Sequence, residues 1–397
     1  MNITISNNLA SVEPSATLAL TAKANELKAQ GRDVCAFTAG EPDFDTPAHI
    51  RKAASDALTK GGKVCRYTPV AGLPEVKEAV AKKYKDDNGL SYAPNQIIIS
   101  SGAKHVLFNA LAAVVNPGDE VLYPAPYWVS YPEMVRAVGG KPVAIDGSKN
   151  PNFAPTGKQV KQAISPRTKA IFLNWPNNPT GAVIEHKQLE DIYGALEGTN
   201  VMVISDEIYE YHLYDGAKHV SGASLGPDAY ARTVTVNSVS KSYAMTGWRI
   251  GYGAGPKHVI DAMSNYQSHA TSNAATVSQL ATVAALTGGT ACVDDMRRAF
   301  NERRLLITQM LNDIPGVECV TPKGAFYAFP KVSALYGKGG VKNSTDFCAK
   351  LLEAEAVAIV PGAPFGADEY VRLSYAVSKD VIEKGVSRIA KFVKSLG

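Results

Sequence analysis

The sequence has no paired-cysteine motif, no long apolar run and no strong excess of charge of either sign. Its five cysteines are dispersed along the chain without a CxxC spacing: Cys35, Cys65, Cys292, Cys319 and Cys348. An odd, dispersed set favours reduced thiols in a cytoplasmic compartment over a disulfide framework or a zinc site. We therefore expect a cytoplasmic protein without a bound metal.

Signals for membranes and for nucleic acids are missing as well. No stretch approaches the roughly 20 apolar residues that a membrane helix needs. The N-terminus lacks the basic region and apolar core of a signal peptide. The formal net charge of +4 is small for 397 residues, and the basic residues are scattered. We therefore expect neither a membrane nor a nucleic acid as a partner.

The length of 397 residues, 45% hydrophobic and 20% charged, suits a globular protein of two domains. Short apolar runs alternate with loops and helical patterns, as at 96–100, 170–174, 201–205 and 233–237. This rhythm is typical of an open α/β sheet, whose ligands bind at the carboxyl ends of the strands. After about residue 290 the pattern changes to long amphipathic helices, with short strands expected at 324–330, 355–362 and 370–376.

The stretch SVSKSYAMTGWRIG, at 238–251, carries the strongest chemical signal. Lys241 follows a predicted strand, three residues after Ser238 and ahead of Arg249. Burial or a nearby positive charge frees a lysine amine for carbonyl chemistry, and hydroxyls with a guanidinium suit a phosphate. These features favour a Schiff-base lysine beside a phosphate site, as pyridoxal 5'-phosphate requires. On local composition alone, a solvated loop lysine is the alternative.

Other positions fit the same ligand, each with a structural alternative. Gly102 and Ala103 form a tight turn before a helix, where free N–H groups bind anions, although many such turns bind nothing. Trp128, just past a strand, could stack on a planar ligand or pack in a core. Asp206 ends an apolar strand, where it could pair with a protonated pyridine nitrogen, cap a helix or form a surface salt bridge.

Three more residues have open roles. Gly40 lies in a loop rich in turn formers and could serve the turn or a ligand. Tyr67 lies in a loop, where a tyrosine taken alone more often serves packing than a ligand. Arg372 lies in an alternating apolar strand, where a guanidinium needs a carboxylate, and a structural salt bridge would provide one. The run RIGYGAG, at 249–255, is discounted as a dinucleotide fingerprint, because the order of strand, glycine turn and helix is poorly met.

Eight segments occur together in a characteristic order: AGEPDFDTP, RYTPVAG, PYWVSYPEM, NNPTG, SDEIYE, SVSKSYAMTGWRIGY, GAFY and VRLSYA. With them the chain resembles fold-type I pyridoxal-phosphate enzymes, specifically class I aminotransferases of the bacterial aspartate aminotransferase subgroup. The resemblance implies an α/β fold with a large, mostly parallel-sheet cofactor domain over 48–289. A smaller α+β domain would combine 1–47 with 290–397, and the protein would be a homodimer with shared active sites.

The resemblance also implies a role for each candidate residue. Lys241 would bind the cofactor covalently and move the substrate α-proton. Asp206 would keep the pyridine nitrogen protonated, and Trp128 would stack on the ring. Tyr209 and Asn178 would hydrogen-bond the phenolic oxygen. The phosphate would be held by Ser238, Arg249, Gly102, Ala103 and Tyr67, the last from the neighbouring subunit. The substrate α-carboxylate would be held by Arg372, helped by Gly40 and Asn178.

A second substrate carboxylate would be read by Lys104 and Thr17, as the resemblance implies. Lysine in the first turn of a helix is an unfavourable placement in the helix dipole, which favours a functional reason for Lys104. Members of the subgroup that accept prephenate have a basic residue where this chain has Glu13, a reversal of charge. We therefore expect ping-pong transamination of L-aspartate with 2-oxoglutarate, giving oxaloacetate and L-glutamate.

Three alternatives stay open. The same site could serve an aromatic or prephenate aminotransferase, or another pyridoxal-phosphate enzyme acting on amino acids. A non-catalytic, cofactor-sensing regulator would carry a DNA-binding helix-turn-helix, and we expect none before Val12.

Overall fold

The computed structural model describes residues 3–397 and is built around a seven-stranded sheet of order β2-β8-β7-β6-β5-β3-β4. The strands are β2 (Ile97–Ser100), β3 (Glu120–Ala125), β4 (Lys141–Asp146), β5 (Thr168–Asn174), β6 (Met202–Asp206), β7 (Thr233–Ser238) and β8 (Gly251–Ala254). Strands β3 to β7 pair in parallel, whereas β8 runs antiparallel to both β2 and β7. This is the mostly parallel α/β sheet expected from the alternating pattern.

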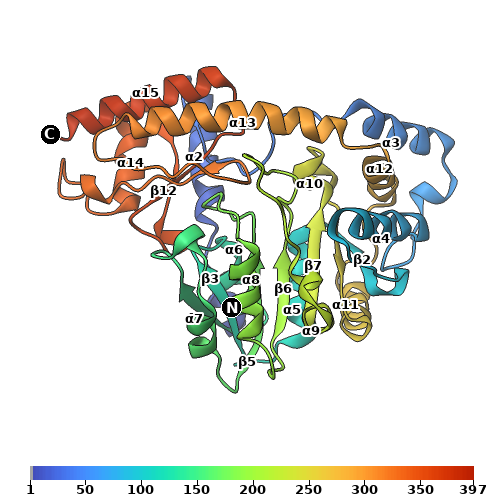
Figure 1. Ribbon diagram of the computed structural model, residues 1–397. Coiled ribbons are helices and arrows are strands. Elements are labelled where there is room, and N and C mark those ends of the chain that lie inside the picture. The colour runs from blue at the N-terminus through green and yellow to red at the C-terminus, as the bar shows by residue number, and fades with distance from the viewer. Residues whose placement is uncertain (1–2) are drawn as a thin grey trace.

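Helices cover both faces of this sheet because its strands alternate between two apolar cores (Figure 1). One face packs against α5 (Ala103–Val114), α6 (Ser130–Ala137) and α11 (Lys257–Ala270). The other face packs against α3 (Ala48–Lys60), α4 (Pro74–Asn88) and α12 (Thr276–Thr287) at one end, and α7 (Gly157–Ala163), α8 (His186–Gly194) and α9 (Pro227–Arg232) at the other. With both faces covered, the carboxyl ends of the parallel strands are left as the place for a ligand.

A second group of elements joins the N-terminal segment to the last quarter of the chain. Strand β1 (Cys35–Ala36) pairs in parallel with β10 (Val357–Ala358), and β11 (Val360–Pro361), β12 (Val371–Ser374) and β9 (Tyr327–Ala328) form an antiparallel sheet. Around them lie α2 (Ala16–Ala29), α13 (Ala291–Asn312), α14 (Ser344–Glu355) and α15 (Lys379–Ser395) (Figure 1). They share a core in which Phe37 meets residues from 296–393. A division at 48 and 290 stays a prediction.

Some local expectations need correction. The strands expected at 324–330 and 355–362 are only the two-residue strands β9, β10 and β11. Ala325 has φ 55, a left-handed conformation that an extended strand does not accommodate. A short helix, α1 (Asn7–Ala10), was not expected. In RIGYGAG, Gly251 and Gly253 lie inside strand β8 and not in a turn before a helix, so the discounted fingerprint is absent.

In residues 3–397, no single helix combines the length and the apolar character needed to cross a membrane. Only the pair α12 and α13, bent by 81°, satisfies length and composition together. All five cysteines are free thiols.

Candidate active site

A cavity of about 380 Å³ opens at the carboxyl ends of β5, β6 and β7, with α2 and β12 contributing its other wall. Of the fourteen residues predicted for the site, twelve line it: Thr17, Gly40, Ala103, Lys104, Trp128, Asn178, Asp206, Tyr209, Ser238, Lys241, Arg249 and Arg372. These residues come from eight separate regions of the sequence. The fold therefore brings them together, while their individual roles stay predictions.

Two predicted residues do not line the cavity. Gly102 lies directly behind Arg249, and a Cβ at this glycine would stand 2.4 Å from Arg249 Nη2. Its φ of 94° is also left-handed, so glycine is needed there for two reasons. Tyr67 is 91% exposed and lies away from the cavity of its own chain.

Lys241 stands in the one-turn helix α10 (Val239–Ser242), which Ser238 caps directly after β7. Its Nζ donates a hydrogen bond to the carbonyl oxygen of Gly40 at 2.5 Å. Burial lowers the pKa of Lys241 to about 8, and the positive charges of Arg249 and Arg372 act in the same direction. The negative charge of Glu41 opposes this shift. An amine with such a pKa can exchange protons near neutral pH.

Asp206 ends β6 and is 2% exposed. Its Oδ2 accepts a hydrogen bond from the Tyr131 hydroxyl at 2.8 Å, whereas its Oδ1 is buried without a partner. Burial raises the pKa of Asp206 to about 6, although the bond from Tyr131 works against the shift. A buried carboxylate with a free oxygen is costly unless a cation meets it. The site is thus built for a cationic group of a ligand.

Arg249 and the start of α5 form a positively polarised end of the cavity. Arg249 has φ 54 and ψ 54, a left-handed conformation that is rare for residues other than glycine, and its Nη1 donates to the Thr246 carbonyl at 2.7 Å. Gly251 lets α5 approach, because a Cβ there would lie 2.1 Å from the Ala103 nitrogen. The first-turn N–H groups of α5 and the guanidinium suit an anion such as a phosphate.

Arg372, on β12, is 1% exposed and projects from the opposite wall. Its Nη1 donates to Asn178 Oδ1 and its Nη2 to the Thr38 carbonyl, both at 2.9 Å. The guanidinium also lies 4.7 Å from the centre of the Tyr327 ring. In residues 3–397, no Asp or Glu pairs with it, so the structural salt bridge that was the alternative is not formed. A buried guanidinium that lacks a counter-charge is suited to a carboxylate from outside.

The remaining predicted residues lie between these two ends. Trp128 has the Lys104 Nζ 4.8 Å above its ring, at the mouth of the cavity. Partial burial lowers the pKa of Lys104, and the charge of Arg249 adds to this effect. The Thr17 Oγ1 is buried without a partner. Glu13 does not line the cavity, and its backbone N–H donates to Glu133 at 2.8 Å.

Several functional positions were missed by the sequence analysis. Tyr131 bonds Asp206, Tyr327 bonds the Tyr209 hydroxyl at 2.8 Å, and Asn174 donates to the Asp206 carbonyl at 2.9 Å. Tyr131 and Tyr327 belong to the motifs PYWVSYPEM and GAFY, so the motifs contained the signal. No spacing in the sequence could say which tyrosine of a motif faces the cavity.

A sequence model of the family "Aminotransferase class I and II" matches residues 32–389 of the chain. The chain belongs to the class I and II aminotransferases. The aspartate aminotransferase of Geobacillus stearothermophilus is 48% identical over 98% of this chain and 99% of its own length. The aspartate/prephenate aminotransferase of Cereibacter sphaeroides is 45% identical over 99% of each chain.

Solved structures agree with this assignment. The aspartate aminotransferase from Rhizobium meliloti superimposes with a TM-score of 0.95 at 41% identity, covering 100% of both chains. The aspartate aminotransferase from Thermus thermophilus with maleate superimposes with a TM-score of 0.93 at 44% identity, covering 98% of this chain and 100% of that one. The aminotransferase fold predicted from the motifs is therefore confirmed.

Proposed function

We propose that this aminotransferase binds pyridoxal 5'-phosphate and transfers the amino group of L-aspartate to 2-oxoglutarate in a ping-pong cycle. One observation carries the proposal: a single cavity holds a lysine with a lowered pKa, a buried carboxylate with an unpartnered oxygen and a buried arginine without a counter-charge. The relatives named aspartate aminotransferase, 45% to 48% identical, support the substrate.

The residues present fit the cofactor. The unpartnered Asp206 Oδ1 is placed to meet a protonated ring nitrogen, and Lys241 would hold the carbonyl carbon covalently. Trp128 offers a ring face, and the Tyr209 hydroxyl and the Asn178 amide would meet the phenolic oxygen. The phosphate would bind at Ser238, Arg249 and the first turn of α5, with Gly102 needed for the close approach.

The chemistry then divides between the cofactor and the chain. Pyridoxal phosphate, when bound, supplies an electron sink that stabilises negative charge at the substrate Cα. Lys241 Nζ takes the α-proton, since a pKa of about 8 leaves part of the amine neutral at physiological pH. Asp206 would supply the negative charge that pairs with the ring nitrogen, and its burial strengthens this electrostatic effect.

Two cationic side chains, Arg372 and Lys104, bind one substrate carboxylate each. Arg372 binds the α-carboxylate of every substrate, oriented by Asn178 and the Thr38 carbonyl. Lys104 and Thr17, at the other side of the cavity, bind the second carboxylate of aspartate, glutamate or 2-oxoglutarate. The Thermus thermophilus relative was solved with maleate, a dicarboxylate, which supports such a pair of anion sites.

Prephenate is a second candidate substrate, favoured by the relatives named aspartate/prephenate aminotransferase at 44% to 45% identity. Glu13 argues against it in this chain, because its negative charge stands in place of a basic residue.

We also propose that the enzyme is a cytoplasmic homodimer. Tyr67, 91% exposed in the single chain, would reach the phosphate site of the neighbouring subunit. Five free cysteines accord with a reducing compartment.

The test is a panel of amino donors with 2-oxoglutarate as acceptor, scored by kcat/KM, that includes aspartate, phenylalanine and alanine, with prephenate tested as an alternative acceptor. We expect aspartate to lead the panel by at least about tenfold, the value of one well-placed charged contact. Borohydride should trap the cofactor on the wild type, and Lys241→Ala should abolish the adduct. If an aromatic donor has the highest kcat/KM, or prephenate is the best acceptor, that compound replaces aspartate as the proposed substrate. An unchanged adduct in Lys241→Ala would show that Lys241 does not bind the cofactor.

A further inference from the structure

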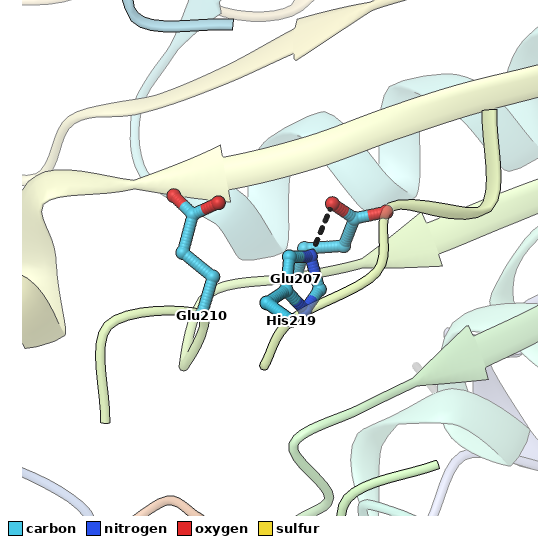
Figure 2. Close-up of side chains that lie close together, drawn as sticks. All are labelled: Glu207, Glu210 and His219. Atoms are coloured by element: carbon cyan, nitrogen blue, oxygen red, sulfur yellow. Dashed lines mark hydrogen bonds and ion pairs between the residues drawn. The ribbon is translucent and has the colours of Figure 1, made fainter. Parts of the chain in front are cut away.

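A second polar cluster lies immediately behind the cavity. Glu207 and Glu210 alternate along the chain with Asp206 and Tyr209, and they are only 2% and 5% exposed. Neither glutamate lines the cavity. Figure 2 shows the Glu207 carboxylate facing His219, whose Nε2 lies 2.8 Å from Oε2. The two glutamates thus mark a rear face of the same chain segment that carries the cofactor-facing residues.

This cluster is not assigned to a metal. Glu207, Glu210 and His219 offer ligand atoms within 4.8 Å of one another. However, Glu207 already accepts from the Ser221 hydroxyl at 2.9 Å and from His219, and Glu210 already pairs with the ammonium of Lys83. A lysine therefore supplies the positive charge that a metal would otherwise bring.

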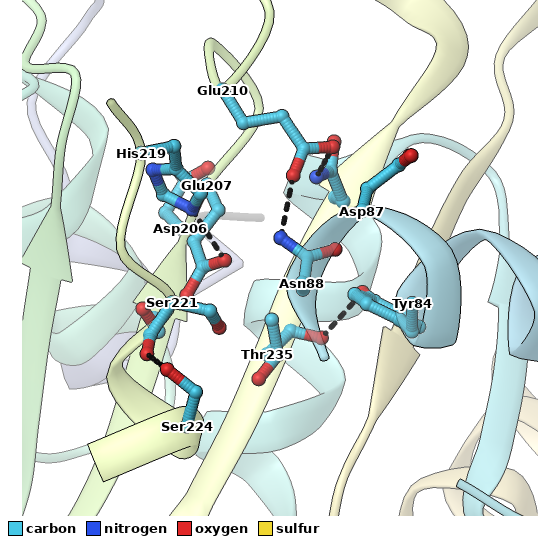
Figure 3. Close-up of polar contacts among 12 residues, drawn as sticks. Tyr84, Asp87, Asn88, Asp206, Glu207, Glu210, His219, Ser221, Ser224 and Thr235 are labelled. Atoms are coloured by element: carbon cyan, nitrogen blue, oxygen red, sulfur yellow. Dashed lines mark hydrogen bonds and ion pairs between the residues drawn. The ribbon is translucent and has the colours of Figure 1, made fainter. Parts of the chain in front are cut away.

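Lys83 comes from the second-to-last turn of α4, and its side chain is 3% exposed. Its Nζ pairs with Glu210 Oε1 and donates to Asn88 Oδ1 at 2.7 Å, while Asn88 Nδ2 donates to Glu210 Oε2 at 2.9 Å. The Tyr84 hydroxyl donates to the Thr235 carbonyl of β7 at 3.0 Å. Figure 3 shows Asn88 and Tyr84 reaching from α4 toward Glu210 and Thr235. Helix α4 is thus joined by buried polar contacts to the segments after β6 and within β7.

Glu210 connects this pair to two cofactor-facing residues. It follows Tyr209 directly in the chain. Its Oε1 also accepts from Asn237 Nδ2 at 2.7 Å, and Asn237 Oδ1 accepts the backbone N–H of Ser238 at 2.7 Å. The Glu210 carboxylate is therefore linked to Tyr209, which is expected to bind the phenolic oxygen. Through Asn237 it is also linked to Ser238, which is expected to bind the phosphate.

We propose that Lys83 is a positioning residue of the aminotransferase site: through Glu210 it places Tyr209, and through Asn237 it places Ser238. The proposal rests on the proposed function, because both placed residues are expected to bind pyridoxal phosphate. Lys83 lies 158 positions before Lys241 and outside the cavity, so it acts only through these neighbours.

The physical reason is the burial of the ion pair. A lysine and a glutamate at 3% and 4% side-chain exposure stabilise each other only while both are present. Without Lys83, Glu210 must take up a proton or turn toward water, and either change alters its bond to Asn237. Tyr209 is the neighbour of Glu210 in the chain, and Ser238, at the end of β7, is the neighbour of Asn237. Small displacements of Glu210 and Asn237 therefore reach the expected cofactor contacts directly.

The experiment compares Lys83→Met with Lys82→Met as a matched control. Lys82 is the preceding residue of α4, 73% exposed in its side chain, and pairs only with exposed Asp86. The measurements are the dissociation constant of pyridoxal phosphate from the refilled apoenzyme and the pH midpoint of the visible absorption band. We expect Lys83→Met to weaken cofactor binding by about tenfold or more and to raise the pH midpoint, with Lys82→Met unchanged. The midpoint rises because a displaced Tyr209 hydroxyl no longer favours the anionic phenolic oxygen.

Two further variants separate positioning from general damage. Asn237→Ala removes only the side chain that links Glu210 to Ser238. It should therefore weaken cofactor binding and leave the pH midpoint of the absorption band unchanged. Lys83→Met/Glu210→Gln removes both charges while keeping an acceptor for Asn237, so it should recover most of the lost affinity.

A folded Lys83→Met with wild-type affinity and midpoint overturns the proposal. If Lys83→Met does not fold, wild-type cofactor affinity in Asn237→Ala overturns it instead. Failure of the proposed function is distinct from both outcomes, because the wild type itself would then bind no pyridoxal phosphate.

Discussion

Tyr131 donates its hydroxyl to Oδ2 of Asp206 at 2.8 Å, while Oδ1 of the same carboxylate is buried without a partner. One oxygen is thus held by Tyr131, and the other is left without a partner in a residue that lines the cavity. The tyrosine is itself fixed, since its ring stacks on Phe172 with centroids 4.4 Å apart. The orientation of the Asp206 carboxylate therefore depends on Tyr131.

Tyr131→Phe should lower kcat while keeping the fold. The phenylalanine keeps the stacking on Phe172 but removes a hydrogen bond to a charged group, worth about 1.5–3 kcal/mol. We expect kcat to fall by about tenfold or more, and the pKa of Asp206 in the apoprotein to rise further. Tyr127→Phe is the control, because Tyr127 packs edge-on against Tyr123 and does not line the cavity. Equal kcat values for the two variants would contradict the role of Tyr131.

Asp206→Asn should stabilise the apoprotein at neutral pH although it inactivates the enzyme. Burial raises the pKa of Asp206 to about 6, above its ordinary value of 3.8, so the folded apoprotein is penalised wherever the carboxylate is ionised. The penalty reaches about 3 kcal/mol at pH 7, is mostly lost by about pH 4, and vanishes only once the pH is well below the ordinary value of 3.8, where both states are protonated. Urea unfolding of the two apoproteins at pH 4 and pH 7 measures it. A difference that is the same at both pH values would exclude ionisation as its source.

Residues that lie inside a sequence motif could be predicted for this site, whereas contacts made only by packing could not. Lys241 and Arg249 lie in one motif after β7, and Asp206 ends β6 in another, so local pattern and resemblance placed them together. Tyr131 and Tyr327 were missed because a motif does not show which side chains face inward. The Lys83–Glu210 pair was missed because it joins residues 127 positions apart, and only the packing of α4 against β7 brings them into contact.

Lys104→Ala should discriminate between substrates. Lys104 stands over the Trp128 ring at the mouth of the cavity, opposite Arg372. Its loss should lower kcat/KM for aspartate and glutamate by about 10- to 100-fold, the value of one charged hydrogen bond, and leave alanine nearly unchanged. Lys60→Ala, on the exposed end of α3, is the control. Equal losses for alanine and aspartate would show that Lys104 does not read the second carboxylate.

Arg372→Leu should weaken every amino acid alike. The guanidinium is oriented by Asn178 and Thr38 and meets no carboxylate of residues 3–397, so its binding partner is the carboxylate common to all substrates. We expect kcat/KM to fall by about 100-fold or more for aspartate and for alanine, as a buried charged contact implies. Arg372→Lys should recover little, since an ammonium cannot reproduce the planar, forked geometry. Steady-state kinetics with aspartate and with alanine measures both losses. A loss confined to aspartate would mean that Arg372 binds the second carboxylate and not the α-carboxylate.

Asp215→Ala should show the opposite behaviour, with a loss of stability and no change in catalysis. Arg304 is a second fully buried arginine, but its Nη1 and Nη2 both bond Asp215 at 2.7 Å. Removing the carboxylate leaves the buried guanidinium bonded only to Asn301 and the Pro322 carbonyl. Because the Asp215 side chain is itself 55% exposed, we expect the free energy of unfolding to fall by about 1–2 kcal/mol. The donation from Arg304 lowers the pKa of Asp215, so this contribution to stability is present above the ordinary carboxyl pKa and is lost as the pH falls through the lowered value.

Asp56→Ala, which breaks only an exposed pair with Lys52, should change stability by less than about 1 kcal/mol. Urea unfolding at pH 7 measures the difference between the two variants, and kcat/KM for aspartate should match the wild type in both. A catalytic defect in Asp215→Ala would mean that this ion pair, like the pair behind the cavity, supports the geometry of the active site.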